Sequence, residues 1–284
     1  VKGTNVTYAV NLPSNSDGST ITIENSSLNG NIALNIWGEN TVVNATDSDF
    51  ISVDNASHEN YAAISINNDG SNSAEGTALN ITRGSIKALD ENEDWSTALS
   101  NATINSTWNI SQETEVIGYI RDVVAIIPFE GSTQYYSFFT LQDAVDYAVG
   151  KNNVTVKVIR DVELTKEVQI KGNVTLDLNS KTVTSSSTKT FEVYANATIK
   201  NGTIANTAVA GRCVDTRKNV ELALIDVNLD AKTGGGNNQA LTIGGSENGT
   251  KVNLTNVNIV SGAASNYQGY GIITFVQTEL NVVD

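Results

Sequence analysis

Apolar residues recur along the second half of the chain at a stride of about 23 residues, and this stride limits the fold more than any other feature. Two series of apolar positions step by 23 and 23 residues and a third steps by 21 and 23: Val168, Phe191 and Val214; Val174, Ala197 and Val220; Val183, Ile204 and Val227. Apolar and polar residues alternate around these positions, which is the period of a strand with one buried face. Short strands that return at a constant stride are typical of a solenoid of stacked coils.

A β-sandwich is the alternative, because it also contains many short alternating strands. Sandwich strands need no constant stride, and their hairpins favour Asn-Gly or Asp-Gly turns between paired strands. Asp17-Gly18, Asp69-Gly70 and Asn201-Gly202 occur, but the stride is kept more regularly than any hairpin pattern. The sequence therefore predicts an all-β chain folded as a parallel β-helix with coils of about 23 residues.

One short α-helix is predicted near residues 140–149. Thr140-Leu141-Gln142-Asp143 has the pattern of an N-terminal capping box, and Gly150 follows as a stop. The apolar residues between them recur at helical spacing: Leu141, Ala144, Val145 and Ala148. Because the end of a solenoid exposes an apolar core and an open strand edge, we expect this helix to cap one.

The segment from Tyr135 to Thr184, YYSFFTLQDAVDYAVGKNNVTVKVIRDVELTKEVQIKGNVTLDLNSKTVT, resembles the start of pectin-lyase-like domains in microbial cell-surface and adhesin-like proteins. In that family an amphipathic helix, a short strand and a phrase like NVTLDLNSKTVT open a right-handed parallel β-helix. The resemblance implies that fold and a place at the cell surface. It also invites comparison with enzymes of the same fold, which cleave polyuronates and related glycans.

The two halves of the chain also resemble one another. Ile21 matches Leu222 at an offset of 201 residues, whereas Leu79 matches Val252 at an offset of 173. The offset between the two halves therefore decreases by about the length of one coil. This decrease predicts that the first half contains an extra coil, between residues 31 and 64. We therefore expect tandem units: residues 1–127 as the C-terminal part of one β-helix unit, and residues 128–284 as the cap helix and start of the next. Both chain ends are expected to lie within a longer array.

Charge and cysteine content exclude several classes of function. The formal net charge of −14 repels nucleic acid and anionic membranes. The single cysteine, Cys213, can form neither an internal disulfide nor a thiolate metal cluster, and is predicted to be a small core residue. The sequence contains no apolar run long enough to span a bilayer.

A search for catalytic residues finds little that matches the enzymes of this fold. Galacturonan hydrolases of the family carry paired Asp residues and a Gly-His-Gly; this chain has no Asp-Asp, and His58 lies between Ser57 and Glu59. We therefore predict no catalytic residues and no cofactor. The best candidate for a lyase-like Ca²⁺ site lies on one strand face, with Arg212 and Arg217 one coil earlier: Asp226, Asn228 and Asp230. A solvated face of an acidic protein is the preferred interpretation of these three residues.

The sequon Asn-x-Ser/Thr occurs fourteen times, among 36 Asn residues. Alternation in strands places Asn and Thr together on an outer face, so side chains stacked at the corners are one explanation. Glycosylation of a surface protein is the other, for a eukaryotic or archaeal source. The candidate positions are Asn5, Asn25, Asn44, Asn55, Asn80, Asn101, Asn105, Asn109, Asn153, Asn173, Asn196, Asn201, Asn248 and Asn253.

Together these observations predict a non-catalytic structural or adhesive segment of an extracellular, cell-surface protein or filament. Its expected partners are neighbouring units of the same chain or filament, together with glycans or proteins of a host or of the environment. The alternative is a carbohydrate-active β-helix, similar to a polysaccharide lyase or hydrolase, or a glycan-binding module. Exposed aromatic residues that could stack on sugars would favour this alternative.

Overall fold

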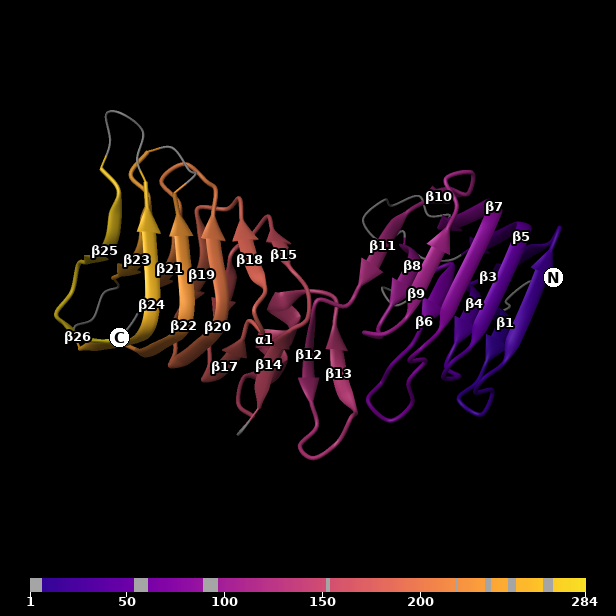
Figure 1. Ribbon diagram of the computed structural model, residues 1–284, viewed down its shortest axis with the longest axis horizontal. Helices are drawn as coiled ribbons and strands as arrows, with labels where there is room; N and C mark the ends of the chain where they lie inside the picture. Colours follow the sequence, from indigo (N-terminus) through magenta and orange to yellow (C-terminus); the bar gives the residue numbers. More distant parts are fainter. Residues whose placement is uncertain are drawn as a thin grey trace. The chain divides into compact units, whose positions relative to one another are not determined.

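The chain is mostly β-structure, which confirms the all-β class. The computed structural model describes residues 7–53, 61–88, 97–151, 154–217, 219–232, 236–244, 249–262 and 268–284. This described part contains 26 strands and one α-helix (Figure 1). The chain divides into two compact units: residues 1–123 with 134–139, and residues 124–133 with 140–284. The predicted boundary at 127/128 thus falls inside β12, a strand of the second unit.

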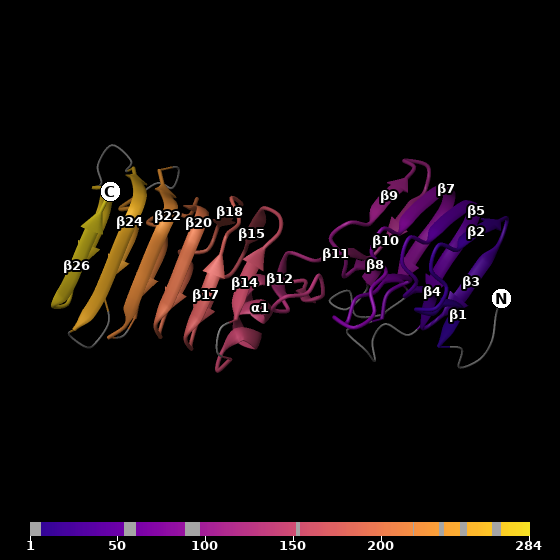
Figure 2. The same cartoon turned by 60° about the horizontal axis from the view of Figure 1, so that its bottom comes forward.

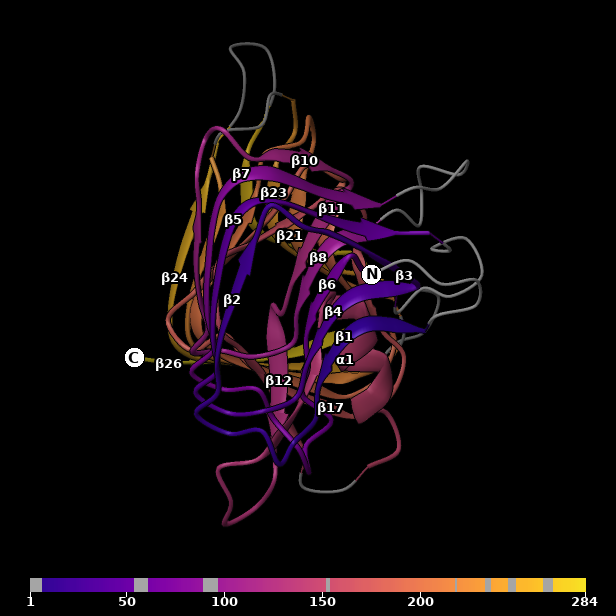
Figure 3. The same ribbon diagram turned by 90° about the vertical axis from the view of Figure 1, so that its right-hand side faces the viewer.

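The first unit contains two parallel sheets, which Figure 3 shows from one end as two layers. One sheet has the order β1 (Tyr8–Leu12), β4 (Ile32–Ile36), β6 (Ile64–Ile66), β8 (Thr97–Asn101) and β11 (Tyr119–Asp122). The other has the order β10 (Glu115–Ile117), β7 (Ala78–Ala88), β5 (Val42–Ser52) and β2 (Thr20–Glu24), with β3 (Ser27–Gly30) on β5 and β9 (Thr107–Ile110) on β7. The strand β13 (Tyr135–Phe138) also belongs to this unit.

The second unit repeats this arrangement, and its strands lie side by side in chain order (Figure 2). The larger sheet contains β12 (Ala125–Pro128), β14 (Thr155–Val158), β17 (Val174–Asp177), β20 (Ala197–Asn206), β22 (Glu221–Ala231), β24 (Thr250–Ser261) and β26 (Thr278–Val283), with β18 (Thr182–Ser185) beside β20 and β15 (Val162–Leu164) beside β18. The smaller sheet has the order β16 (Val168–Ile170), β19 (Lys189–Val193), β21 (Arg212–Thr216), β23 (Gln239–Ile243) and β25 (Tyr270–Thr274). Because β12 is antiparallel to β14, the larger sheet is mixed.

The only α-helix of the described residues, α1 (Leu141–Ala148), lies where the sequence predicts it. The hydroxyl of Thr140 accepts a hydrogen bond from the backbone N–H of Asp143, as a capping box requires. The predicted apolar face is buried, and Gly150 follows with a φ of 76°, a left-handed conformation that suits glycine after a helix. No helix of the described residues is long and apolar enough to cross a membrane.

In both units the chain visits the two sheets alternately, and we call one visit to each sheet a rung. Strand pairing confirms most of the predicted stride: Val168 pairs with Phe191, Phe191 with Val214, and Val174 with Ala197. The pairing of Val183 with Ile204 confirms the third series over its first step. Strands one stride apart in sequence are therefore direct neighbours in a sheet.

The last step of two series was wrong by two residues. Ala197 pairs with Leu222 instead of Val220, and Ile204 pairs with Leu229 instead of Val227. Two extra residues in the connection from β21 to β22 shift the register while both strands stay in their sheets. Since side chains in a strand alternate, a shift of two residues preserves the buried face. Val220 and Val227 are accordingly buried as well, which is why the sequence pattern did not expose the error.

The predicted extra rung in the first unit is present. In the second unit Leu222 pairs directly with Val252. Their counterparts in the first unit, Ile21 and Leu79, do not pair with each other; both pair with Val43, which lies between them in the sheet. The strands β4 and β5 supply this rung.

The matched positions also share backbone conformation at the bends of their strands. Asn25 and Asp226, which are related by the larger of the two offsets, have φ values of 46° and 55°. Arg83 and Asn256, which are related by the smaller offset, have φ values of 61° and 50°. Left-handed φ angles are uncommon for residues other than glycine, so this agreement supports the alignment of the two halves.

Each unit has its own core between its two sheets. In the first unit Phe50 and Leu34 have no exposed surface, and in the second Phe191 and Leu224 are equally buried. Full burial of one such side chain contributes about 1.5–3 kcal/mol, so every rung adds a similar increment to stability. Cys213 lies in this second core, as predicted, and burial raises the pKa of its thiol to about 12.

Candidate functional site

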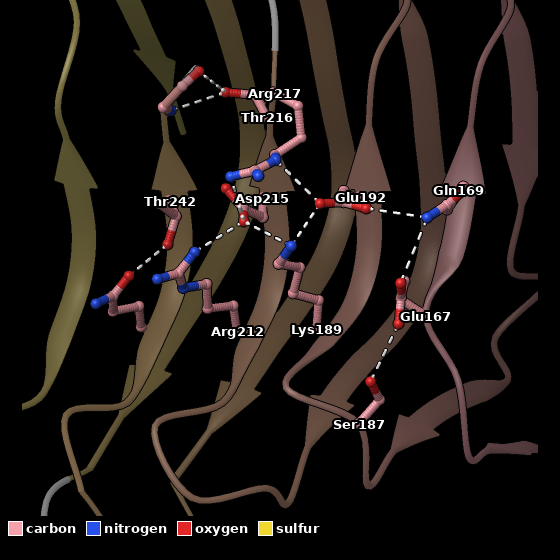
Figure 4. Close-up of polar contacts among 12 residues, drawn as sticks. Glu167, Gln169, Ser187, Lys189, Glu192, Arg212, Asp215, Thr216, Arg217 and Thr242 are labelled. Atoms are coloured by element: carbon pink, nitrogen blue, oxygen red, sulfur yellow. Dashed lines mark hydrogen bonds and ion pairs between the residues drawn. The ribbon is translucent and has the colours of Figure 1, made fainter. Parts of the chain in front are cut away.

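The most concentrated group of charged side chains in the described residues lies on the smaller sheet of the second unit. Glu192 and Asp215 occupy paired positions on β19 and β21, and their side chains point away from the core because Phe191 and Val214 point into it. Despite this outward direction, Glu192 is 3% exposed and Asp215 is fully buried. We call these two carboxylates, with Lys189, Arg212 and Arg217, the ion network (Figure 4).

Three cations surround the two carboxylates and cover them from solvent. Arg212 Nη1 lies 2.8 Å from Asp215 Oδ2, and Arg217 Nε lies 3.0 Å from Glu192 Oε1. Lys189 Nζ donates to Glu192 Oε1. Lys189 Nζ and Arg217 Nη1 each lie 3.7 Å from Asp215 Oδ2. The side chains of the cations are 20–40% exposed, whereas those of the carboxylates are 1–4% exposed. The network therefore presents basic groups to solvent and keeps its acids beneath them.

Neutral side chains extend the network along the same face. Gln169 Nε2 donates to Glu192 Oε2 at 3.2 Å and to Glu167 Oε1 at 3.4 Å, and the hydroxyl of Ser187 donates to Glu167. Beyond Asp215, the hydroxyl of Thr242 donates to Gln239 at 2.7 Å. Polar side chains thus line this face from β16 to β23, across four neighbouring strands (Figure 4).

The electrostatic environment keeps Glu192 ionised. Burial opposes its charge most strongly, but hydrogen bonds from Lys189 and Tyr194 and the charges of Lys189 and Arg217 outweigh that effect, so the pKa of Glu192 lies below its ordinary value. A general acid in glycoside cleavage needs the opposite change, a raised pKa. The network is therefore suited to hold ion pairs rather than to donate a proton.

One atom of the network stands apart. The carboxylate oxygen Asp215 Oδ1 is buried and has no hydrogen-bond partner in the described residues, while Oδ2 is held by all three cations. A buried polar atom without a partner costs free energy, and here the neighbouring positive charges reduce that cost.

The predicted Ca²⁺ candidates lie on a different sheet from these residues. Asp226, Asn228 and Asp230 alternate on β22 with the buried Val227 and Leu229, so they lie on the outer face of the larger sheet, as predicted. Asp226 Oδ1 accepts from Asn256 Nδ2 at 2.7 Å, and Asp230 Oδ1 accepts from the backbone N–H of Lys232 at 2.9 Å.

The arginines that the sequence placed one coil earlier are on β21 and its end, bound to Glu192 and Asp215. The two arginines and the three oxygen-bearing side chains of the Ca²⁺ candidate therefore lie on different sheets. Over the described ranges, no group of three or more His, Cys, Asp and Glu side chains is placed to hold a metal ion. The position of His58 lies outside the described residues.

Asparagine side chains form hydrogen-bonded columns, but mostly within strands rather than at the corners, where the stacking hypothesis placed them. On one sheet of the first unit, Asn80 Nδ2 donates to Asn44 Oδ1 at 2.9 Å and Asn109 Nδ2 donates to Asn80 Oδ1 at 2.8 Å. We call these three residues the Asn ladder. A second column on the other sheet joins three residues in the same way: Asn11, Asn35 and Asn67.

The fourteen sequons fall into several settings. Four lie outside the described residues: Asn5, Asn55, Asn153 and Asn248. Five are exposed, four are half-buried, and Asn101 is 3% exposed. The exposed ones are Asn25, Asn105, Asn109, Asn173 and Asn196; the half-buried ones are Asn44, Asn80, Asn201 and Asn253.

Sequence reasoning missed the ion network. Its residues recur at the stride of the core, since Lys189 pairs with Arg212 and Glu192 pairs with Asp215 on the next rung. A search of the polar positions for that stride, in addition to the apolar ones, could have found the network.

Comparison with known proteins adds no assignment to this geometry. No protein-family model matches the chain, and neither a curated protein nor a solved structure matches it.

Proposed function

We propose that the chain is a non-catalytic structural or adhesive segment of an extracellular surface protein or filament, built from tandem right-handed parallel β-helix units. The parallel pairing of successive rungs supports the β-helix. Parallel strands joined through a crossover are right-handed in nearly all proteins, which supports the handedness along with the family resemblance. Its partners would be neighbouring units of the same chain or filament.

The observation that carries this proposal is that two buried carboxylates are bound by cations from neighbouring rungs. Arg217, at the end of β21, binds Glu192 on β19 at 3.0 Å, and Lys189 on β19 lies 3.7 Å from Asp215 on β21. The lowered pKa of Glu192 suits a permanent ion pair. Asparagine columns do the same with uncharged groups. Interactions of this kind resist separation of rungs, which is what a stalk under tension needs.

Pulling the ends of the chain in a force spectrometer tests the structural role. A segment of stacked rungs should resist extension and then release a unit cooperatively. For a unit of about 150 residues the released length would be at most roughly 540 Å, at about 3.6 Å per residue. Gradual extension at low force would contradict the proposal.

An activity assay tests the non-catalytic part. The chain should leave polyuronates and other acidic glycans intact when Ca²⁺ is added. Robust cleavage that is lost in Asp226→Ala or in Glu192→Gln would overturn the proposal and point to a lyase or hydrolase.

A glycan-binding module is the second candidate, favoured by a shallow groove of about 450 Å³ on the outer face of the larger sheet. Thr155, Thr175 and Thr198 line it on successive strands, with Lys151 and Glu221 beside them. Hydroxyl and charged groups along a groove can bind sugar hydroxyls. A glycan array separates the candidates, because a stalk should give no specific signal, whereas a module should give signals that Thr175→Val weakens.

A further inference from the structure

The ten described sequons differ in what their amide nitrogens already bind. In five of them Nδ2 donates a hydrogen bond within the fold: Asn80, Asn101, Asn109, Asn201 and Asn253. We call these the tied sequons. Asn80 and Asn109 are tied in the Asn ladder, and Asn101 is both buried and bound to Asp122. Asn44, the acceptor at the end of the ladder, is half-buried within β5 and is placed in neither group.

Four others lie at corners between strands, are exposed, and make no side-chain hydrogen bond through Nδ2 in the described part of the chain. We call these the corner sequons: Asn25, Asn105, Asn173 and Asn196. Asn173 and Asn196 each directly precede a strand, β17 and β20, on consecutive rungs. The side-chain oxygen of Asn196 accepts from the backbone N–H of Glu221 at 2.8 Å, so only Nδ2 of this amide remains without a partner.

The hydroxyls that complete two of these sequons are also within reach of solvent. Thr175 and Thr198 follow Asn173 and Asn196 by two residues, are half-buried, and line the groove of about 450 Å³ together with both asparagines. Asn173 and Asn196 thus combine a reachable hydroxyl, the open space of the groove and an amide nitrogen that none of the described residues binds. The tied sequons lack the last of these.

We propose that, among the described sequons, the folded chain accepts N-linked oligosaccharide at the corner sequons in preference to the tied sequons. The donor would be an oligosaccharide on a lipid diphosphate, brought by an oligosaccharyltransferase. The bond between Asn Nδ2 and the sugar C1 forms while the bond from C1 to the diphosphate breaks, and the amide nitrogen loses one proton as the lipid diphosphate leaves. For its use in a cell, this inference rests on the extracellular placement proposed above.

Glycosylation of the folded protein in vitro tests the assignment. The refolded full chain is incubated with a purified oligosaccharyltransferase and a lipid-linked oligosaccharide, and the occupancy of each sequon is followed by mass spectrometry of peptides. Synthetic peptides that span each sequon serve as the unfolded reference. Relative to its own peptide, each tied sequon should react on the order of ten-fold more slowly than a corner sequon does, since one net hydrogen bond must first be lost.

Matched variants make the result specific. In Asn109→Ala the side-chain oxygen of Asn80 loses a donor while Asn80 Nδ2 stays bound, so Asn80 should remain slow to react. In Asn44→Ala the acceptor of Asn80 Nδ2 is gone, so Asn80 should react as fast as a corner sequon. Thr175→Ala should abolish modification at Asn173 alone. Equal relative rates at corner and tied sequons, or faster reaction at the tied ones, would overturn the inference. Neither result depends on whether the chain binds or cleaves glycans, so a failure here is distinct from a failure of the structural proposal.

Discussion

The two units join their rungs with different chemistry. The Asn ladder of the first unit links three strands with neutral amides that donate to one another in series. The ion network of the second unit links adjacent strands with buried carboxylates and partly exposed cations. Neutral amides cost less to desolvate than charged groups and do not titrate, whereas a buried charge that loses its partner is strongly destabilising. The same architecture therefore responds differently to mutation, pH and salt in its two units.

The largest expected effect comes from breaking the ion network. Asp215→Ala leaves Arg212, Lys189 and Arg217 without their shared acceptor, and should lower the free energy of unfolding by about 3 kcal/mol, as for other buried ion pairs that lose one partner. Urea denaturation measures the change, with Asp226→Asn as the control, because asparagine removes an exposed charge on the other sheet and still suits the left-handed φ of that position. A cost no greater than that of the control would show that the network contributes no stability.

A smaller effect is expected from the Asn ladder. Asn80→Ala removes one hydrogen bond that Asn80 donates and one that it accepts, and should cost about 1–2 kcal/mol. The exposed corner variant Asn105→Ala is the matched control. If Asn80→Ala destabilised the protein more than Asp215→Ala does, the Asn ladder would contribute more to stability than the ion network, which would contradict the expected order.

The effect of pH sharpens the comparison further. Because the pKa of Glu192 is lowered in the folded state, the unfolded chain binds that proton more readily. Its stabilising contribution is therefore fully present above the ordinary carboxyl pKa and is lost as the pH falls through the lower folded value. The difference in unfolding free energy between wild type and Glu192→Gln should stay constant from pH 7 to about pH 5 and shrink below it. For Asn80→Ala the difference should be independent of pH; a parallel decline in both variants would contradict this account.

The smallest effect is expected at an exposed ion pair. Arg83 Nε and Nη2 donate to the two carboxylate oxygens of Asp47 at 2.6 Å each, but both side chains are more than 40% exposed, so solvent screens even this bidentate pair. Arg83 also has a φ of 61°, which asparagine adopts more readily than arginine. Arg83→Asn should therefore leave the melting temperature unchanged within error, by circular dichroism in low and in high salt. If Arg83→Asn clearly lowered the melting temperature, and high salt lowered that of the wild type by a similar amount, the pair would have a larger role in stability.

Much of the fold follows from sequence, because the core alternates and repeats. The stride from Val168 to Val214 predicts direct pairing, and the cap at Thr140 follows from residue types alone. The register after β21 was wrong because Val220 and Leu222 are both apolar and point the same way, so alternation cannot distinguish them. The ion network was missed because only apolar positions were searched for the stride; its members recur at the same stride, but the burial of Glu192 and Asp215 depends on the cations that cover them.

The connections between rungs differ widely in length while the pairing they serve does not change. Val43 is much farther along the chain from Leu79 than from Ile21, yet it is a direct neighbour of both in one sheet. The place of a residue in the sheet is thus set by the number of strands that precede it, not by the number of residues. Residues added between strands therefore leave the core unchanged. The chain should accordingly accept a foreign peptide between β21 and β22, where additional residues are already accommodated, as a site for display on an otherwise unaltered scaffold.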